Sequence, residues 1–129
     1  MYNTVWYDNL IKPFLTPPAW VFAPVWIFLY ATLLIALILY TIKITKTEKF
    51  RGYIYFIFQM LLNLAWSPAF FIQQNIKLAL GLIILLDLFA VLMLRRFFIV
   101  SKMSGAILIP YILWILFATY LNIGFFILN

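Results

Sequence analysis

The sequence predicts an all-α membrane protein, a bundle of four transmembrane helices. Of its 129 residues, 68% are hydrophobic and only 9% are charged, whereas a soluble domain is about half apolar and a quarter charged. Four segments are apolar over the roughly 20 residues that a spanning helix needs. The strict apolar-polar alternation of membrane β-strands is missing. Helices are therefore expected, because they satisfy their own backbone hydrogen bonds in lipid.

The expected spans cover approximately residues 19–42, 53–73, 77–98 and 104–127. Their connections are short, so consecutive helices are expected to be antiparallel neighbours within a single domain over 1–129. Residues 1–18 contain three prolines and no basic start followed by an apolar stretch. They are interpreted as a loop rather than a signal peptide.

Basic residues gather in two connections. The loops 43–51 and 95–103 hold seven of the nine Lys and Arg residues, and both lie on the same side of the predicted bundle. By the positive-inside rule this side faces the cytoplasm or its topological equivalent, and both termini face away from it. The net charge of +6 is thus interpreted as a sign of membrane topology, and nucleic-acid binding is not expected.

The residue types present exclude several kinds of chemistry. The chain has no Cys and no His, so disulfides, thiolate chemistry and the commonest metal ligand and general base are ruled out. No metal and no required cofactor are expected. Hydroxyl nucleophiles lack their usual activating base, which disfavours classical enzyme chemistry. Asp87 is the one acid within a span; a structural hydrogen-bonding role is favoured, although intramembrane carboxylates are also functional candidates.

Polar residues in the second span share one helix face. Gln59, Asn63 and Ser67 recur every four residues. Buried amides need partners, so this face is expected to point into the bundle. It is interpreted as hydrogen-bonding glue between helices, as the wall of a pocket, or as both.

Tryptophans and small residues alternate in the first and last spans. Trp114, Ala118 and Leu121 fall on one face of the last span, which is typical either of ordinary packing or of a dent in the core. Trp20 and Trp26 begin the first span, where Trp20 also suits an interfacial anchor. These residues favour an aromatic-lined bundle able to hold an apolar ligand.

Three motifs carry a family resemblance. They are PPAWVFAPVW at 17–26, QMLLNLAWSP at 59–68 and PYILWILFATYLN at 110–122. They resemble, in order and spacing, the signatures of the TspO/MBR family of tryptophan-rich sensory and translocator proteins. The loop residues 6–18 are similar to the segment that joins the first two helices of that family. The resemblance implies five spans, of which this chain holds the last four. The first helix is then expected to be lost, dispensable or supplied by another chain.

The resemblance also implies a ligand pocket inside the bundle, with residues 1–18 as a lid. The pocket is expected to take porphyrins, and in many members sterols or benzodiazepine-type ligands. Matched by position, the ligand-binding residues are Trp20, Phe22, Ala23, Trp26, Asn63, Trp66, Trp114, Ala118 and Leu121, with Gly81 and Leu85 added from the next helix. Ile123 and Ile127 replace the Tyr and Arg of the sterol motif of animal members, so that motif is not expected to act here.

The expected function is binding of a porphyrin or similar planar apolar ligand for sensing, transport or stress regulation. The chain would act within the bilayer, as a homodimer or in a hetero-complex. Two alternatives stay open. One is an accessory subunit of a larger membrane assembly. The other is an enzyme that degrades protoporphyrin in light through the two tryptophans that the resemblance matches, Trp26 and Trp114.

Overall fold

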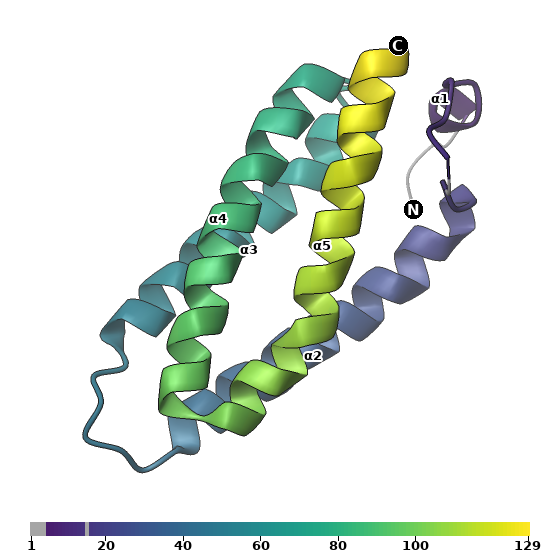
Figure 1. The fold of residues 1–129 in the computed structure, drawn as a ribbon. Helices are drawn as coiled ribbons and strands as arrows, with labels where there is room; N and C mark the ends of the chain where they lie inside the picture. Colours follow the sequence, from purple (N-terminus) through teal and green to yellow (C-terminus); the bar gives the residue numbers. More distant parts are fainter. Residues whose placement is uncertain (1–4, 15) are drawn as a thin grey trace.

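The computed structural model describes residues 5–14 and 16–129. A short helix α1 (Val5–Asp8) and a 3-10 turn η1 (Ala19–Val21) precede four long helices. These are α2 (Phe22–Ile42), α3 (Phe50–Phe71), α4 (Ile76–Val100) and α5 (Lys102–Leu128) (Figure 1). Each of the four is long and apolar enough to cross a membrane. The predicted all-α, four-span fold is therefore confirmed, and the helix ends lie within three residues of the predicted spans.

Polar side chains at the loops fix where the helices begin and end. The Glu48 carboxylate accepts a hydrogen bond from the Arg51 backbone N–H at 2.6 Å, at the start of α3. Asn75 Oδ1 accepts from the Leu78 N–H at 3.0 Å and caps α4. Lys49 Nζ donates to two carbonyls at the end of α2, at 2.8 and 2.6 Å. These bonds satisfy backbone groups that the helices leave unpaired at their ends.

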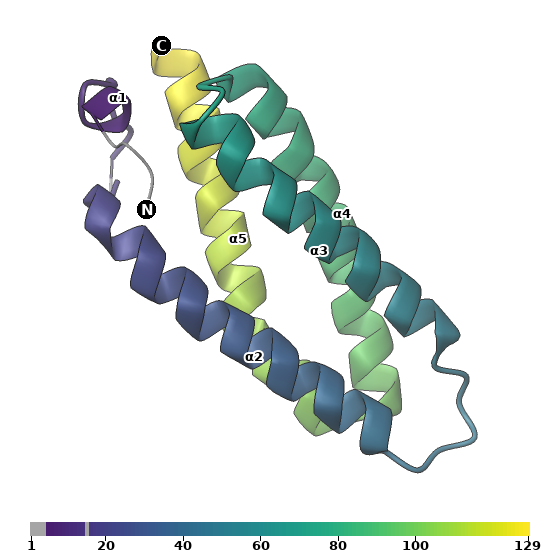
Figure 2. The same cartoon turned by 180° about the vertical axis from the view of Figure 1, so that it is seen from behind.

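The helices pack in the order α2, α5, α4, α3. Closest packing joins α3 to α4 and α4 to α5, while α2 packs along α5. The expectation that all consecutive helices are neighbours is thus wrong for α2 and α3. The connections at 72–75 and 101 are too short to allow anything else, but the loop 43–49 is long enough to carry the chain past α5 and α4. Figures 1 and 2 show this loop extending beyond the bundle, and α2 diverging from the other helices towards the end where α1 lies.

A chain of hydrogen bonds, two of them buried and one half-buried, joins α2, α3 and α5. Tyr30 Oη donates to Asn63 Oδ1 at 2.8 Å, and Asn63 Nδ2 donates to Tyr111 Oη at 2.8 Å. The Tyr111 hydroxyl then donates to Gln59 Oε1 at 2.6 Å. Gln59 and Asn63 are fully buried while Ser67 is half-buried. The prediction that this polar face of α3 points inward and forms hydrogen bonds between helices is therefore confirmed.

The intramembrane acid has a structural partner as well. Thr119 Oγ1 of α5 donates to Asp87 Oδ2 of α4 at 2.5 Å. This bond supports the interpretation of Asp87 as a hydrogen-bonding group between two helices.

Tyr111→Phe should destabilise the bundle. It removes the hydroxyl that serves both buried amides, so we expect the free energy of unfolding to fall by about 1–3 kcal/mol. Tyr53→Phe is the matched control, because within residues 5–14 and 16–129 its hydroxyl bonds only to Thr41, at an exposed site. It should cost less than about 0.5 kcal/mol. Thermal unfolding in detergent measures both, and equal losses would contradict a special role for the buried chain.

Candidate ligand site

Three tryptophans from three helices meet near the end of the bundle that carries α1. The ring centroid of Trp26 on α2 lies 6.2 Å from that of Trp66 on α3 and 6.4 Å from that of Trp114 on α5. Phe22, one turn before Trp26, lies 5.9 Å from Trp114. The inclined and edge-to-face arrangements are those that aromatic rings prefer. Each ring lies on the side of its helix that faces the other two helices of the cluster.

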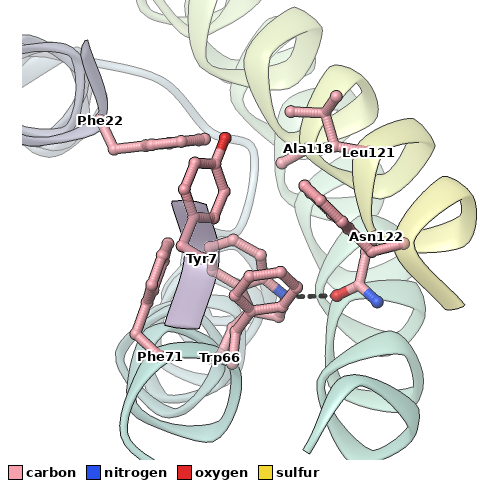
Figure 3. Close-up of a pocket in the computed structure, with 9 residues that line it drawn as sticks. Tyr7, Phe22, Trp66, Phe71, Ala118, Leu121 and Asn122 are labelled. Atoms are coloured by element: carbon pink, nitrogen blue, oxygen red, sulfur yellow. Dashed lines mark hydrogen bonds between the residues drawn. The ribbon is translucent and has the colours of Figure 1, made fainter. Parts of the chain in front are cut away.

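A small cavity of about 10 Å³ lies beside this cluster (Figure 3). Its lining residues are Tyr7, Phe22, Trp66, Phe70, Phe71, Ala118, Leu121, Asn122 and Phe125. A water molecule needs about 10–15 Å³ measured in this way. The site is therefore closed and nearly filled by its own aromatic side chains.

Tyr7 fills the centre of the site from α1. Its side chain is fully buried, and its ring centroid lies 5.7 Å from Phe22, 5.8 Å from Phe71 and 5.6 Å from Phe125. Figure 3 shows its ring between residues of α2 and α3. The Tyr7 hydroxyl donates to the Pro17 carbonyl at 2.8 Å. One side chain of a four-residue helix thus occupies the space between three long helices.

The described part of the predicted lid, 5–14 and 16–18, lies over this end and is tied to α5. Tyr120 Oη donates to the Phe14 carbonyl at 2.6 Å. The Asn129 side chain accepts from the Ile11 N–H at 3.1 Å and donates to the Ile11 carbonyl at 2.9 Å. Pro13 packs on Gly124, where an added Cβ would lie 2.5 Å from the proline ring. Glycine is needed at this point because the two segments approach so closely.

The polar groups of the site differ in how they are paired. Trp66 Nε1 donates to Asn122 Oδ1 at 2.9 Å, and Asn122 Nδ2 donates to the Ile76 carbonyl at 3.2 Å. The indole N–H of Trp114 is buried and has no hydrogen-bond partner among the residues that the structure describes. Buried donors are nearly always paired, so this N–H is a candidate donor to a bound molecule.

The structure brings together most of the predicted site residues. Those gathered around the tryptophan cluster are Phe22, Trp26, Asn63, Trp66, Trp114, Ala118 and Leu121, with Ala23 half-buried on the same helix. Trp20 is 73% exposed and does not line the cavity. Gly81 and Leu85 are exposed on α4 and line a separate surface depression with Leu78 and Leu82.

Several lining residues were not predicted. They are Tyr7, Phe70, Phe71, Asn122 and Phe125. A helical signal was available for Phe70, which follows Trp66 by one turn, and for Phe125, which follows Leu121 by one turn. No periodicity points to Tyr7, because its position depends on how an irregular segment folds back over the bundle.

Comparison with known proteins agrees with this arrangement. Residues 1–128 match the model of the TspO/MBR family. The chain belongs to the TspO/MBR family. It is 40% identical to "Tryptophan-rich protein TspO" of Chlorobaculum tepidum, over 96% of this chain and 79% of that protein. It is 41% identical to the protein of the same name in Archaeoglobus fulgidus, over 96% and 80%. Identity to the human "Translocator protein" is 34%, over 91% and 70%.

This TspO/MBR chain is an integral, multi-pass membrane protein, since its four long helices are all apolar enough to span a bilayer. Its tryptophans concentrate at one end. Three of the five meet in the cluster, and Trp6 packs edge-on against Phe70 with ring centroids 5.3 Å apart. The family resemblance found in the sequence is therefore confirmed.

Gly124→Val should loosen the lid while leaving the helices in place. The added side chain would overlap Pro13, so we expect amide hydrogen exchange in residues 5–14 to quicken about tenfold or more, with the centres of α3 and α4 unchanged. Gly81→Val is the matched control, because a Cβ there meets no atom of the described residues within 4 Å. Unchanged amide exchange in the lid of the Gly124 variant would show that the contact between Pro13 and Gly124 does not hold the lid in place.

Proposed function

We propose that this TspO/MBR protein binds a planar, apolar ligand of the tetrapyrrole class, such as a porphyrin, at the tryptophan cluster, and that it does so for sensing or transport. The observation that carries the proposal is the buried, unpaired N–H of Trp114 among aromatic rings. A porphyrin has broad apolar faces that suit stacking and polar edge groups that accept hydrogen bonds. The distribution of loop charges supports a location of the site on the non-cytoplasmic side of the membrane.

Two kinds of group would hold such a ligand. The rings of Trp26, Trp66 and Trp114 offer apolar surface, and aromatic contacts of this kind contribute about 0.5–1.5 kcal/mol each beyond burial. Trp114 Nε1 would donate to a polar atom at the ligand edge. Asn63 already pairs with Tyr30 and Tyr111. It would therefore act by fixing the distance between α2 and α3, which sets the spacing of the aromatic rings that meet the ligand.

Binding requires the lid to move. Pockets for small molecules have volumes of about 300–1,000 Å³, and the closed cavity has about 10 Å³. The obstacle is Tyr7, because its ring fills the space between Phe22, Phe71 and Phe125. Withdrawal of α1 with Tyr7 would enlarge the site without breaking the hydrogen bonds that join the long helices.

Replacing Trp26 and Trp114 by Phe should weaken the binding of protoporphyrin about tenfold, because stacking area and the indole donor are both lost. Titration of the detergent-purified protein, followed by the porphyrin absorbance against empty micelles, measures this. Trp20→Phe is the control, because the family resemblance assigns Trp20 to the site whereas the structure leaves it exposed. It should leave affinity unchanged, since Trp20 is 73% exposed while Trp26 is buried. Unchanged protoporphyrin affinity in the double variant would contradict the proposed site.

The role of the lid can be tested by kinetics. Gly124→Val should speed the association of protoporphyrin several-fold, since it favours the open state, and should raise the apparent affinity by a comparable factor because a larger fraction of the protein can bind. Stopped-flow quenching of tryptophan fluorescence follows the association. An association rate equal to that of the unaltered protein, in a variant whose lid exchanges faster, would show that the lid does not gate the site.

A further inference from the structure

A second pocket lies at the opposite end of the bundle, between α3 and α4. It has a volume of about 160 Å³ and is lined by Arg51, Tyr55, Leu92, Arg95, Arg96 and Ile99. We propose that this pocket binds the phosphate group of an anionic phospholipid. The inference does not rest on the proposed porphyrin function, because the two sites share no residue and lie near opposite ends of the long helices.

The spacing of the residues gathers them on two facing helix surfaces. Arg51 and Tyr55 are four residues apart near the start of α3. Leu92, Arg96 and Ile99 follow one face of α4 at intervals of four and three, with Arg95 beside them. The two helices pack antiparallel along most of their length. Three arginines thereby line one depression.

Their hydrogen bonding leaves the pocket ready for an anion. Arg96 Nη2 donates to Glu48 Oε2 at 2.8 Å and to the Glu48 carbonyl at 2.6 Å, which fixes the orientation of this guanidinium. Its Nε is buried and unpaired within the described part of the chain. The Arg51 and Arg95 guanidiniums likewise have no hydrogen-bond or ion-pair partner there. Planar arginine donors suit phosphate oxygens better than ammonium groups do.

The local charge is strongly unbalanced. Seven of the nine basic residues lie at this end of the molecule, and Glu48 is the one acid there, since Asp8 is in α1 and Asp87 is near the middle of α4. One carboxylate neutralises one of the three pocket arginines. The remaining positive charge of the pocket is complementary to an anionic phosphodiester group, whose oxygens accept hydrogen bonds.

The surroundings favour a lipid over a soluble phosphate. Leu92 lies one turn of α4 deeper in the span than Arg96, and Ile99 is 51% exposed on the same apolar helix. The arginines are within two turns of the helix ends, which is the depth of the headgroup region. Basic pockets between transmembrane helices at this depth suit anionic headgroups. The phosphate would meet the arginines while the acyl chains run past Leu92.

The experiment compares charge-matched variants. The double variant Arg51→Gln with Arg95→Gln removes two pocket donors but keeps the Arg96–Glu48 pair. Lys46→Gln with Lys102→Gln removes the same charge from the same end outside the pocket. Dissociation constants are obtained by native mass spectrometry of purified protein titrated with phosphatidylglycerol, with phosphatidylcholine as the neutral lipid. We expect about a twentyfold loss of phosphatidylglycerol affinity in the arginine variant and less than about threefold in the lysine variant.

Two control experiments test the role of arginine geometry and the choice of a lipid over free phosphate. Arg51→Lys with Arg95→Lys retains charge and should lose affinity to an intermediate degree, because the planar fork is gone; it also serves if the glutamine variant folds poorly. Inorganic phosphate should not raise the thermal midpoint of the protein, whereas phosphatidylglycerol should. Equal weakening in the arginine and lysine variants would overturn the pocket, and equal stabilisation by inorganic phosphate would overturn the lipid.

Discussion

The bilayer interior offers no water to pair a buried amide, so the polar groups of the spans must find one another. In this protein that requirement links helices whose backbones lie apart. The backbones of α2 and α3 do not pack together, yet Tyr30 of α2 reaches Asn63 of α3, and Asn63 reaches Tyr111 of α5. The hydrogen-bonded chain fixes the separation of three helices and with it the distances between Trp26, Trp66 and Trp114.

The two ends of the bundle are chemically opposite. At one end aromatic rings and a tied segment of chain exclude water, and the exposed charges are few. At the other, arginines and lysines surround a single carboxylate that caps α3 and fixes Arg96 at once. Glu48 therefore joins the beginning of one helix to the end of another, and it makes the basic end an ordered surface as well as a charged one.

How much the sequence predicts depends on whether a feature repeats along a helix. The four helices follow from apolar runs, and the inward face of Gln59 and Asn63 follows from their four-residue spacing. The packing of α2 on α5 could not be predicted, because the loop 43–49 allows more than one partner. Tyr7 has no periodic signal: its position is set by contacts with Phe22, Phe71 and Phe125, which are distant in the sequence. A ligand-binding role for Gly81 and Leu85 was predicted only from the family resemblance, in the helix that matches the family least clearly. The structure places both residues on the outer surface of α4.

The ties between the lid and α5 join residues far apart in the chain. Ile11 and Asn129 are separated by 118 positions, and Phe14 and Tyr120 by 106. Contacts of such separation form late, because the intervening chain must first be ordered. The lid segment, which precedes all four long helices in the described chain, is thus the last to settle. The tryptophan cluster therefore assembles before the lid covers it. Tyr7 enters the cluster only after α5 has packed against the other helices.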